Sequence, residues 1–207
     1  MTTTEPTVFV VDDDPALQQS VHALLASAGI HAESFSSAGE FLATFDPERR
    51  GCIVLDLLLG EENGLDLLEN LRTRPLHPPI IVLTAHGTVP SSVRAMRGGA
   101  IDFMEKPVRP PALVSRIREA FDIDGRRRDT RAQRSLLEKR ARRLSARERQ
   151  VASLLMAGNR SKDIATQLGL SVRTVEGYRA RLLQKMQADS APHLVTMLVS
   201  SGVKLDG

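Results

Sequence analysis

The chain has 207 residues, of which 42% are hydrophobic and 26% charged, which suits one large or two small folded domains. Its single cysteine excludes an intrachain disulfide, and no apolar run approaches the ~18 residues of a membrane span. Residues 1–123 carry 10 Lys/Arg and 17 Asp/Glu (net −7), whereas residues 124–207 carry 18 and 8 (net +10). This asymmetry predicts two domains with different partners, the basic one facing a polyanion.

The first residues, Met1–Pro6, lack the basic flank and the apolar stretch of a signal peptide. The lone cysteine, Cys52, fits a reducing compartment, so we predict a cytoplasmic protein without membrane contact. Cys52 lies at the head of an apolar run, where we expect a small buried residue and not a reactive thiol.

Residues 7–123 alternate short apolar runs with amphipathic stretches. The predicted strands are Thr7–Val11, Ala32–Phe35, Ile53–Asp56, Ile80–Thr84 and Asp102–Met104. The predicted helices are Pro15–Ala28, Ala38–Phe45, Gly64–Thr73, Val89–Arg97 and Pro111–Phe121. Five repeats of a strand followed by a helix indicate a doubly wound α/β domain over residues 1–123, with a five-stranded parallel sheet covered on both faces.

Residues 124–143 are rich in arginine and show no apolar stripe wide enough for a core. We predict a basic linker, which either is a solvated tether or contacts phosphates directly. Residues 144–207 have an all-helical pattern, and Ser145 with Glu148 forms a capping box that opens its first helix, which ends near Gly158. The other predicted helices of this all-α, four-helix domain are Lys162–Leu168, Val172–Met186 and a last one from Ser190 to Gly202.

Polar residues lie at the carboxyl ends of four of the predicted strands. Asp12, Asp13 and Asp14 follow the first strand, Asp56 ends the third, Thr84 ends the fourth, and Lys106 follows the fifth. In an open parallel sheet these ends meet at one edge, where ligands bind. Carboxylates held close together need a cation, and a hard divalent ion with oxygen ligands, such as Mg²⁺, fits well.

This set of residues suits transfer of a phosphoryl group to a carboxylate. Lys106 offers a point charge and Thr84 a hydrogen-bond donor for an anion beside the metal. Asp56 is the best candidate nucleophile, because it follows the most apolar strand and stands alone. Asp12 and Asp13 are better placed as metal ligands together with Asp56, and Asp14 as the N-cap of the following helix.

Four motifs of the first domain resemble the signature of response-regulator receivers, which have a flavodoxin-like fold. They are Val8–Asp14, Val54–Asp56, Val82–Ala85 and Asp102–Pro107. The resemblance covers residues 7–122 and implies that Asp56 accepts a phosphoryl group from the phospho-His of a sensor histidine kinase. It also implies that Asp12 and Asp13 hold Mg²⁺ together with the backbone carbonyl of Leu58.

The same resemblance assigns Lys106 and Thr84 to the phosphoryl oxygens and gives Phe103 the position of the family's rotating switch aromatic. We expect Thr84 to move on phosphorylation and Phe103 to rotate into the space it leaves. This rotation is predicted to promote a homodimer by reshaping the surface around Val93, Arg94, Arg97 and Ile101. The chain departs from the family at Leu59-Gly60, where Met-Pro is usual.

The second and third helices of the basic domain, joined by a turn at Gly169, have helix-turn-helix spacing, in which the second of the pair enters the major groove of double-stranded DNA. The residues expected to face the core from that helix are Val175, Tyr178, Leu182 and Met186. The candidate DNA contacts are Arg173, Thr174, Glu176, Gly177, Ala180, Arg181 and Lys185.

Residues 144–201 resemble the LuxR-type output domain. The matching stretches are Leu144–Arg149, Ala157–Asn159, Ile164-Ala165 and Arg173–Glu176. The two domains together resemble the NarL/FixJ subfamily, although Tyr178 stands where that family commonly has His. The resemblance implies a cytoplasmic transcription factor, not a turnover enzyme, with RNA polymerase as a further candidate partner.

Three other classes fit parts of the pattern. An aspartyl-phosphate phosphatase or phosphotransferase typically carries a second acid two residues after its nucleophile, where this chain has Leu58. A nucleotide-binding domain would need a glycine-rich loop in place of Val11–Asp14. A DNA-binding protein with a decayed receiver would have no use for the complete acidic set.

Overall fold

The computed structural model describes residues 5–74 and 76–203. The predicted domain ends at residues 1 and 207, and most of the Met1–Pro6 segment, therefore lie outside the described residues. Two compact units, Met1–Arg127 and Arg128–Gly207, make up the chain. No helix in the part of the chain that the structure describes is long and apolar enough to cross a membrane.

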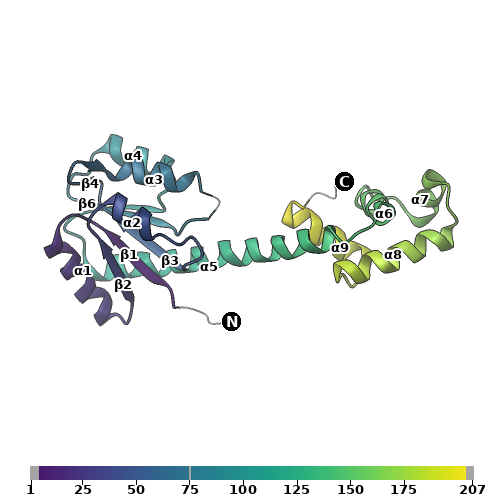
Figure 1. The fold of residues 1–207 in the computed structure, drawn as a ribbon, viewed down its shortest axis with the longest axis horizontal. Helices are drawn as coiled ribbons and strands as arrows, with labels where there is room; N and C mark the ends of the chain where they lie inside the picture. Colours follow the sequence, from purple (N-terminus) through teal and green to yellow (C-terminus); the bar gives the residue numbers. More distant parts are fainter. Residues whose placement is uncertain (1–4, 75, 204–207) are drawn as a thin grey trace. The chain divides into compact units, whose positions relative to one another are not determined.

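The first unit is built on a five-stranded parallel sheet with the order β2-β1-β3-β6-β7 (Figure 1). Its strands are β1 (Thr7–Val11), β2 (His31–Phe35), β3 (Gly51–Leu55), β6 (Ile80–Thr84) and β7 (Asp102–Glu105). The three central strands are buried along their whole length, because their Val, Ile and Leu side chains meet a helix layer on each face.

Five helices cover the two faces of this sheet. They are α1 (Pro15–Ser27), α2 (Ala38–Thr44), α3 (Gly64–Arg72), α4 (Val89–Arg97) and the first part of α5 (Pro110–Ala141). One core joins the sheet to α2, α3 and α4, and a second core joins it to α1 and α5. This arrangement confirms the predicted doubly wound fold, and each buried aliphatic side chain in it contributes about 1.5–3 kcal/mol of hydrophobic free energy.

Cys52 lies within the second of these cores and is fully buried. Burial raises the pKa of its thiol well above the ordinary value, since an apolar environment disfavours the thiolate. The expectation of a small buried residue is therefore confirmed.

Helix α5 is longer than predicted and includes most of the expected linker. The predicted helix ended at Phe121, whereas α5 continues to Ala141. Asp124 is buried in the first unit, where its Oδ2 accepts a hydrogen bond from the Gly51 N–H at 3.1 Å. Leu137 and Ala141 are buried in the core of the second unit. Isolated buried residues among many arginines leave no apolar stripe, so the sequence pattern did not reveal them.

The second unit holds α6 (Ala146–Met156), α7 (Ser161–Leu168), α8 (Val172–Met186) and α9 (Ala191–Ser201), and the other three all pack against α8. The capping box at the start of α6 is formed, because Glu148 Oε2 accepts from the Ser145 N–H at 2.8 Å. Gly169 ends α7 with a φ of 64°, a left-handed conformation that costs glycine little. Val175, Leu182 and Met186 are buried as predicted, while Tyr178 is only partly buried.

Candidate functional site

The carboxyl ends of β1, β3, β6 and β7 meet at one edge of the sheet, since these strands pair in parallel register. Asp12 directly follows β1 and Asp56 directly follows β3, and both carboxylates are buried. Thr84, the last residue of β6, is fully buried beside them. The expected convergence of these residues is therefore present.

Lys106 joins the two buried carboxylates. Its Nζ donates to Asp12 Oδ2 at 2.7 Å and to Asp56 Oδ2 at 2.6 Å. The Lys106 side chain is only 15% exposed, so both contacts are largely shielded from solvent. One ammonium thus partly neutralises two acids that would otherwise repel each other in a medium of low polarity.

The pKa values of these three groups follow from burial and from the shared hydrogen bonds. Burial raises the pKa of Asp56, but hydrogen bonds from Lys106 and Thr84 outweigh it and hold that pKa below its ordinary value. At Asp12 burial is the larger effect, so its pKa lies above the ordinary value although Lys106 also donates to it. Burial lowers the pKa of Lys106, and its two carboxylate partners more than offset that effect. Asp56 and Lys106 are therefore both charged at neutral pH.

The other carboxylate oxygens of Asp12 and Asp56 accept hydrogen bonds from backbone N–H groups. Asp56 Oδ1 accepts from the N–H groups of Leu57 and Leu58, the latter at 3.2 Å. Asp12 Oδ1 accepts from the Asp14 N–H at 3.0 Å. Asp14 itself caps α1, because its Oδ1 accepts from the Ala16 N–H at 2.9 Å, which confirms that prediction.

Asp13 is exposed and makes a contact that the sequence did not reveal. Its Oδ2 accepts from the Gly60 N–H at 3.0 Å. Gly60 has a φ of 64° and lies between β4 (Leu58–Leu59) and β5 (Glu62–Asn63), a short antiparallel hairpin that also was not predicted. Proline, the usual residue of the family at this position, has no N–H and cannot adopt that φ, so the hydrogen bond depends on the departure at Gly60.

Gln18 is a second residue that sequence reasoning missed. Its Nε2 donates to the carbonyl oxygens of Asp12 at 2.6 Å and Phe35 at 3.2 Å. The side chain thereby fastens α1 to the ends of β1 and β2, next to the acidic cluster. A polar residue in the second turn of a helix gives no signal of such a contact in the sequence.

Thr84 and Phe103 lie on neighbouring strands, β6 and β7. Thr84 Oγ1 accepts from the His86 N–H at 3.3 Å. Phe103 is half-buried at the margin of the core, and it also lines a surface hollow of about 540 Å³ with residues of β7 and α5. The aromatic ring thus borders both the core and open space.

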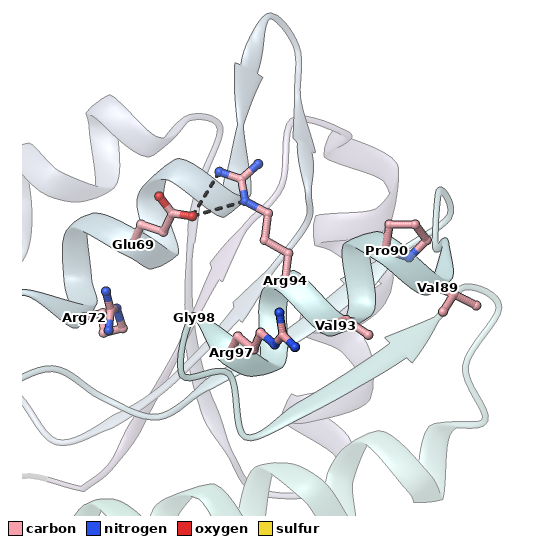
Figure 2. A pocket seen from close by; sticks show the side chains of 8 residues that line it. All are labelled: Glu69, Arg72, Val89, Pro90, Val93, Arg94, Arg97 and Gly98. Carbon is pink, nitrogen blue, oxygen red and sulfur yellow. Dashed lines mark hydrogen bonds and ion pairs between the residues drawn. The ribbon is translucent and has the colours of Figure 1, made fainter.

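The surface predicted to change on activation includes a groove of about 560 Å³ between α3 and α4. Val93, Arg94 and Arg97 line it from α4, and Figure 2 shows Arg94 reaching Glu69 of α3, with an N–O distance of 3.0 Å. Val93 is 44% exposed, whereas Ile101 is half-buried against the core that holds α1 and α5. The groove therefore combines exposed aliphatic and basic side chains.

Most of the predicted DNA contacts lie on one exposed face of α8. Arg173, Thr174, Ala180 and Arg181 are exposed, and Gly177 is partly so. The Arg181 guanidinium lies over the Tyr178 ring, 4.8 Å from its centre. Thr174 is held at the start of the helix by the Ser171 N-cap. Glu176 and Lys185 form hydrogen bonds with neighbouring helices, and the exposed Arg181 also lies near α6, with its Nε 3.8 Å from Glu148 Oε1.

The fold and these two sites define a class of protein: a doubly wound domain with a lysine-bridged pair of aspartates at its sheet edge, carried in one chain with a helix-turn-helix unit. The family model described as response regulator receiver domain matches residues 8–118. The model described as bacterial regulatory proteins, luxR family, matches residues 142–198. The chain belongs to the response regulators of the NarL/FixJ kind, with a receiver domain and a LuxR-type DNA-binding domain.

Similar proteins span nearly the whole chain. The transcriptional regulatory protein FixJ of Azorhizobium caulinodans is 43% identical over 199 residues, which cover 95% of this chain and 93% of that protein. Nodulation protein W of Bradyrhizobium diazoefficiens is 38% identical, covering 97% and 88%. Among solved structures, the response regulator StyR matches with a TM-score of 0.83 and 38% identity over 95% of this chain and 100% of that one. Full-length FixJ from B. japonicum matches with a TM-score of 0.58 and 37% identity over 97% and 98%.

Proposed function

We propose that this response regulator accepts a phosphoryl group on Asp56 from the phospho-His of a sensor histidine kinase, and that phosphorylation promotes dimerisation and sequence-specific DNA binding. The observation that carries the proposal is the ammonium of Lys106, which lies 2.6 Å from Asp56 Oδ2 and also contacts Asp12. A carboxylate oxygen of Asp56 attacks phosphorus while the P–N bond to the kinase histidine breaks. Lys106 and Thr84 then stabilise the charge on the phosphoryl oxygens.

The donor set at this edge fits Mg²⁺. Asp12, Asp13 and Asp56 offer carboxylate oxygens and Leu58 a backbone carbonyl, which are the ligands that hard divalent ions prefer. Within the described residues these acids do not form a ready-made cluster of three, and Asp13 uses one oxygen for Gly60. When bound, Mg²⁺ would neutralise phosphoryl oxygens next to Asp56.

The proposed output is regulation of transcription through α8 in the major groove. We assign Arg173, Thr174, Gly177, Ala180 and Arg181 to that contact, because they share the exposed face of the helix. RNA polymerase is a further proposed partner, and chromosomal DNA as the target implies action in the cytoplasm. The direct test compares DNA affinity and oligomeric state with and without a small phosphodonor plus Mg²⁺. Equal values in the two conditions would contradict regulation by phosphorylation.

We further propose that Thr84 and Phe103 couple phosphorylation to a dimer formed through the surface around Val93. Shifting the receiver from a mostly monomeric to a mostly dimer-forming state needs roughly 5 kcal/mol of differential stabilisation. Several charge-assisted contacts to one phosphoryl group can supply this free energy. Thr84→Ala should therefore still accept phosphate at Asp56 but dimerise poorly afterwards. Sedimentation of the phosphorylated variant measures this, with Thr44→Ala, an exposed threonine of α2, as the control. A dimer population like that of the wild type in Thr84→Ala would exclude Thr84 as the switch.

Arg173 gives the clearest test of the DNA contact, because it takes part in none of the ion pairs found among the described residues. Arg173→Ala should weaken DNA binding and reduce the slope of log affinity against log salt by about one, since one phosphate contact is lost. Titrations at several salt concentrations measure that slope. Arg147→Ala removes the same charge from α6 and should leave the slope unchanged. Equal slopes for the Arg173 variant and the wild type would contradict the contact.

A further inference from the structure

Glu176, one of the predicted DNA contacts on α8, is bonded to α7. Its Oε1 accepts a hydrogen bond from the hydroxyl of Ser161, the first residue of α7, and another from Arg179 Nη1 at 3.1 Å. Arg179 Nη1 also donates to the Ser161 hydroxyl, so the three side chains form a closed triangle between the two helices of the helix-turn-helix. Ser161 is buried, so the Glu176 oxygen that accepts its hydrogen bond points toward α7.

The charge of Glu176 supports the same conclusion. A carboxylate on a face that meets a polyanion is unfavourable unless a cation neutralises it. Arg179 supplies that cation from the next turn of the same helix. The pair is thereby neutral, and Oε1 of Glu176 is bonded within the protein, although the Glu176 side chain is 54% exposed.

Lys185, in the last turn of α8, is bonded in a corresponding way to α6. Its Nζ donates to Glu148 Oε2 at 2.6 Å and to the Arg143 carbonyl oxygen at 3.3 Å. The Glu148 side chain is only 3% exposed and also accepts from the Ser145 N–H. The ammonium of Lys185 is therefore drawn toward α6, although its side chain remains 38% exposed.

We propose that Glu176 and Lys185 are positioning residues, which hold α8 at its second and its last turn in the second unit and touch neither bases nor phosphates. The inference rests on the proposed DNA binding by α8. The two clamps lie about 13 Å apart along the helix axis, so together they fix both its tilt and its rotation. They hold the exposed face with Arg173 and Arg181 in one orientation.

The first experiment measures sequence preference and salt dependence with the phosphorylated full-length chain and a pool of random-sequence duplexes. Glu176→Gln and Ser161→Ala should each weaken binding about fivefold for all sequences without changing the preferred bases, and the double variant should be no weaker than either single variant. Lys185→Met should keep the salt slope of the wild type. A new preferred base in Glu176→Gln, or a slope lower by about one in Lys185→Met, would overturn the inference.

The second experiment measures the helix angles without DNA, from NMR residual dipolar couplings of the full-length chain. Glu176→Gln should change the angle between α7 and α8, and Lys185→Met that between α6 and α8. Gln184→Ala, an exposed residue of the same helix, should change neither. Unchanged angles in both clamp variants would overturn the inference whatever the DNA result. A wild type without salt-sensitive DNA binding would instead contradict the proposed function alone.

Discussion

Asp56→Asn is expected to abolish incorporation of phosphate from a small phosphodonor in the presence of Mg²⁺. The amide keeps the size of the side chain but lacks a nucleophilic carboxylate oxygen. Lys106 keeps its contact to Asp12, so the fold of the first unit should persist. Intact-mass measurement before and after treatment gives the result directly, as the loss of the phosphoryl mass increase.

Asp14→Asn provides the matched control for this experiment. Asp14 lies in the same acidic segment but caps α1, and asparagine is an equally good N-cap. This variant should therefore be phosphorylated like the wild type. Undiminished labelling of Asp56→Asn would show that another residue is the acceptor.

The second large effect is expected at Glu148, the buried acid that joins α6 to α8. Glu148→Ala removes the capping hydrogen bond to Ser145 and leaves Lys185 without its carboxylate partner. Breaking a fully buried ion pair costs about 3–5 kcal/mol. Because Lys185 can still reach water, we expect a smaller loss, about 2–3 kcal/mol in the free energy of unfolding. The chain has one tyrosine and no tryptophan, so the fluorescence of Tyr178 reports urea unfolding of the second unit alone.

Glu138→Ala is the matched control, because Glu138 pairs with Arg134 at 3.0 Å on the exposed surface of the same unit. Surface pairs of this kind contribute about 0–1 kcal/mol. An equal loss of stability in the two variants would contradict the special role of Glu148.

The contribution of Glu148 should also depend on pH. Burial raises the pKa of Glu148, but hydrogen bonds from Lys185 and Ser145 outweigh it and hold that pKa below the ordinary value. The folded state therefore binds a proton less readily than the unfolded state. The stabilisation is fully present above the ordinary pKa of a glutamate and is lost as the pH falls through the lower pKa of the folded state. The difference between wild type and Glu148→Ala should shrink over that acidic range.

The acidic site could be predicted because its residues are fixed by position along the strands. Once Asp12, Asp56 and Thr84 are assigned to the ends of parallel strands, the topology brings them to one edge. The contacts of Gln18 and Gly60 could not be predicted in this way. They depend on where a helix and a hairpin approach that edge, and neither side chain type nor spacing encodes that approach.

In the basic unit, too, the sequence predicted which residues are buried but not which distant partners the exposed ones contact. Helical periodicity correctly separated the buried Val175 and Leu182 from the exposed face of α8. It could not distinguish exposed residues that reach outward from Glu176 and Lys185, whose side chains bend toward α7 and α6. That distinction depends on partners far away in the sequence, such as Glu148.

The buried carboxylate of Asp124 limits where this receiver can be joined to another output domain. A graft that joins this receiver to a foreign output domain before residue 124 would leave the N–H of Gly51 without its partner, at the start of the strand that leads to Asp56. An unsatisfied buried donor costs about 1–3 kcal/mol. A fusion point between Arg127 and Arg128 keeps Asp124 with the receiver and coincides with the division between the two compact units. Chimaeric regulators built at that point should retain the receiver's native stability.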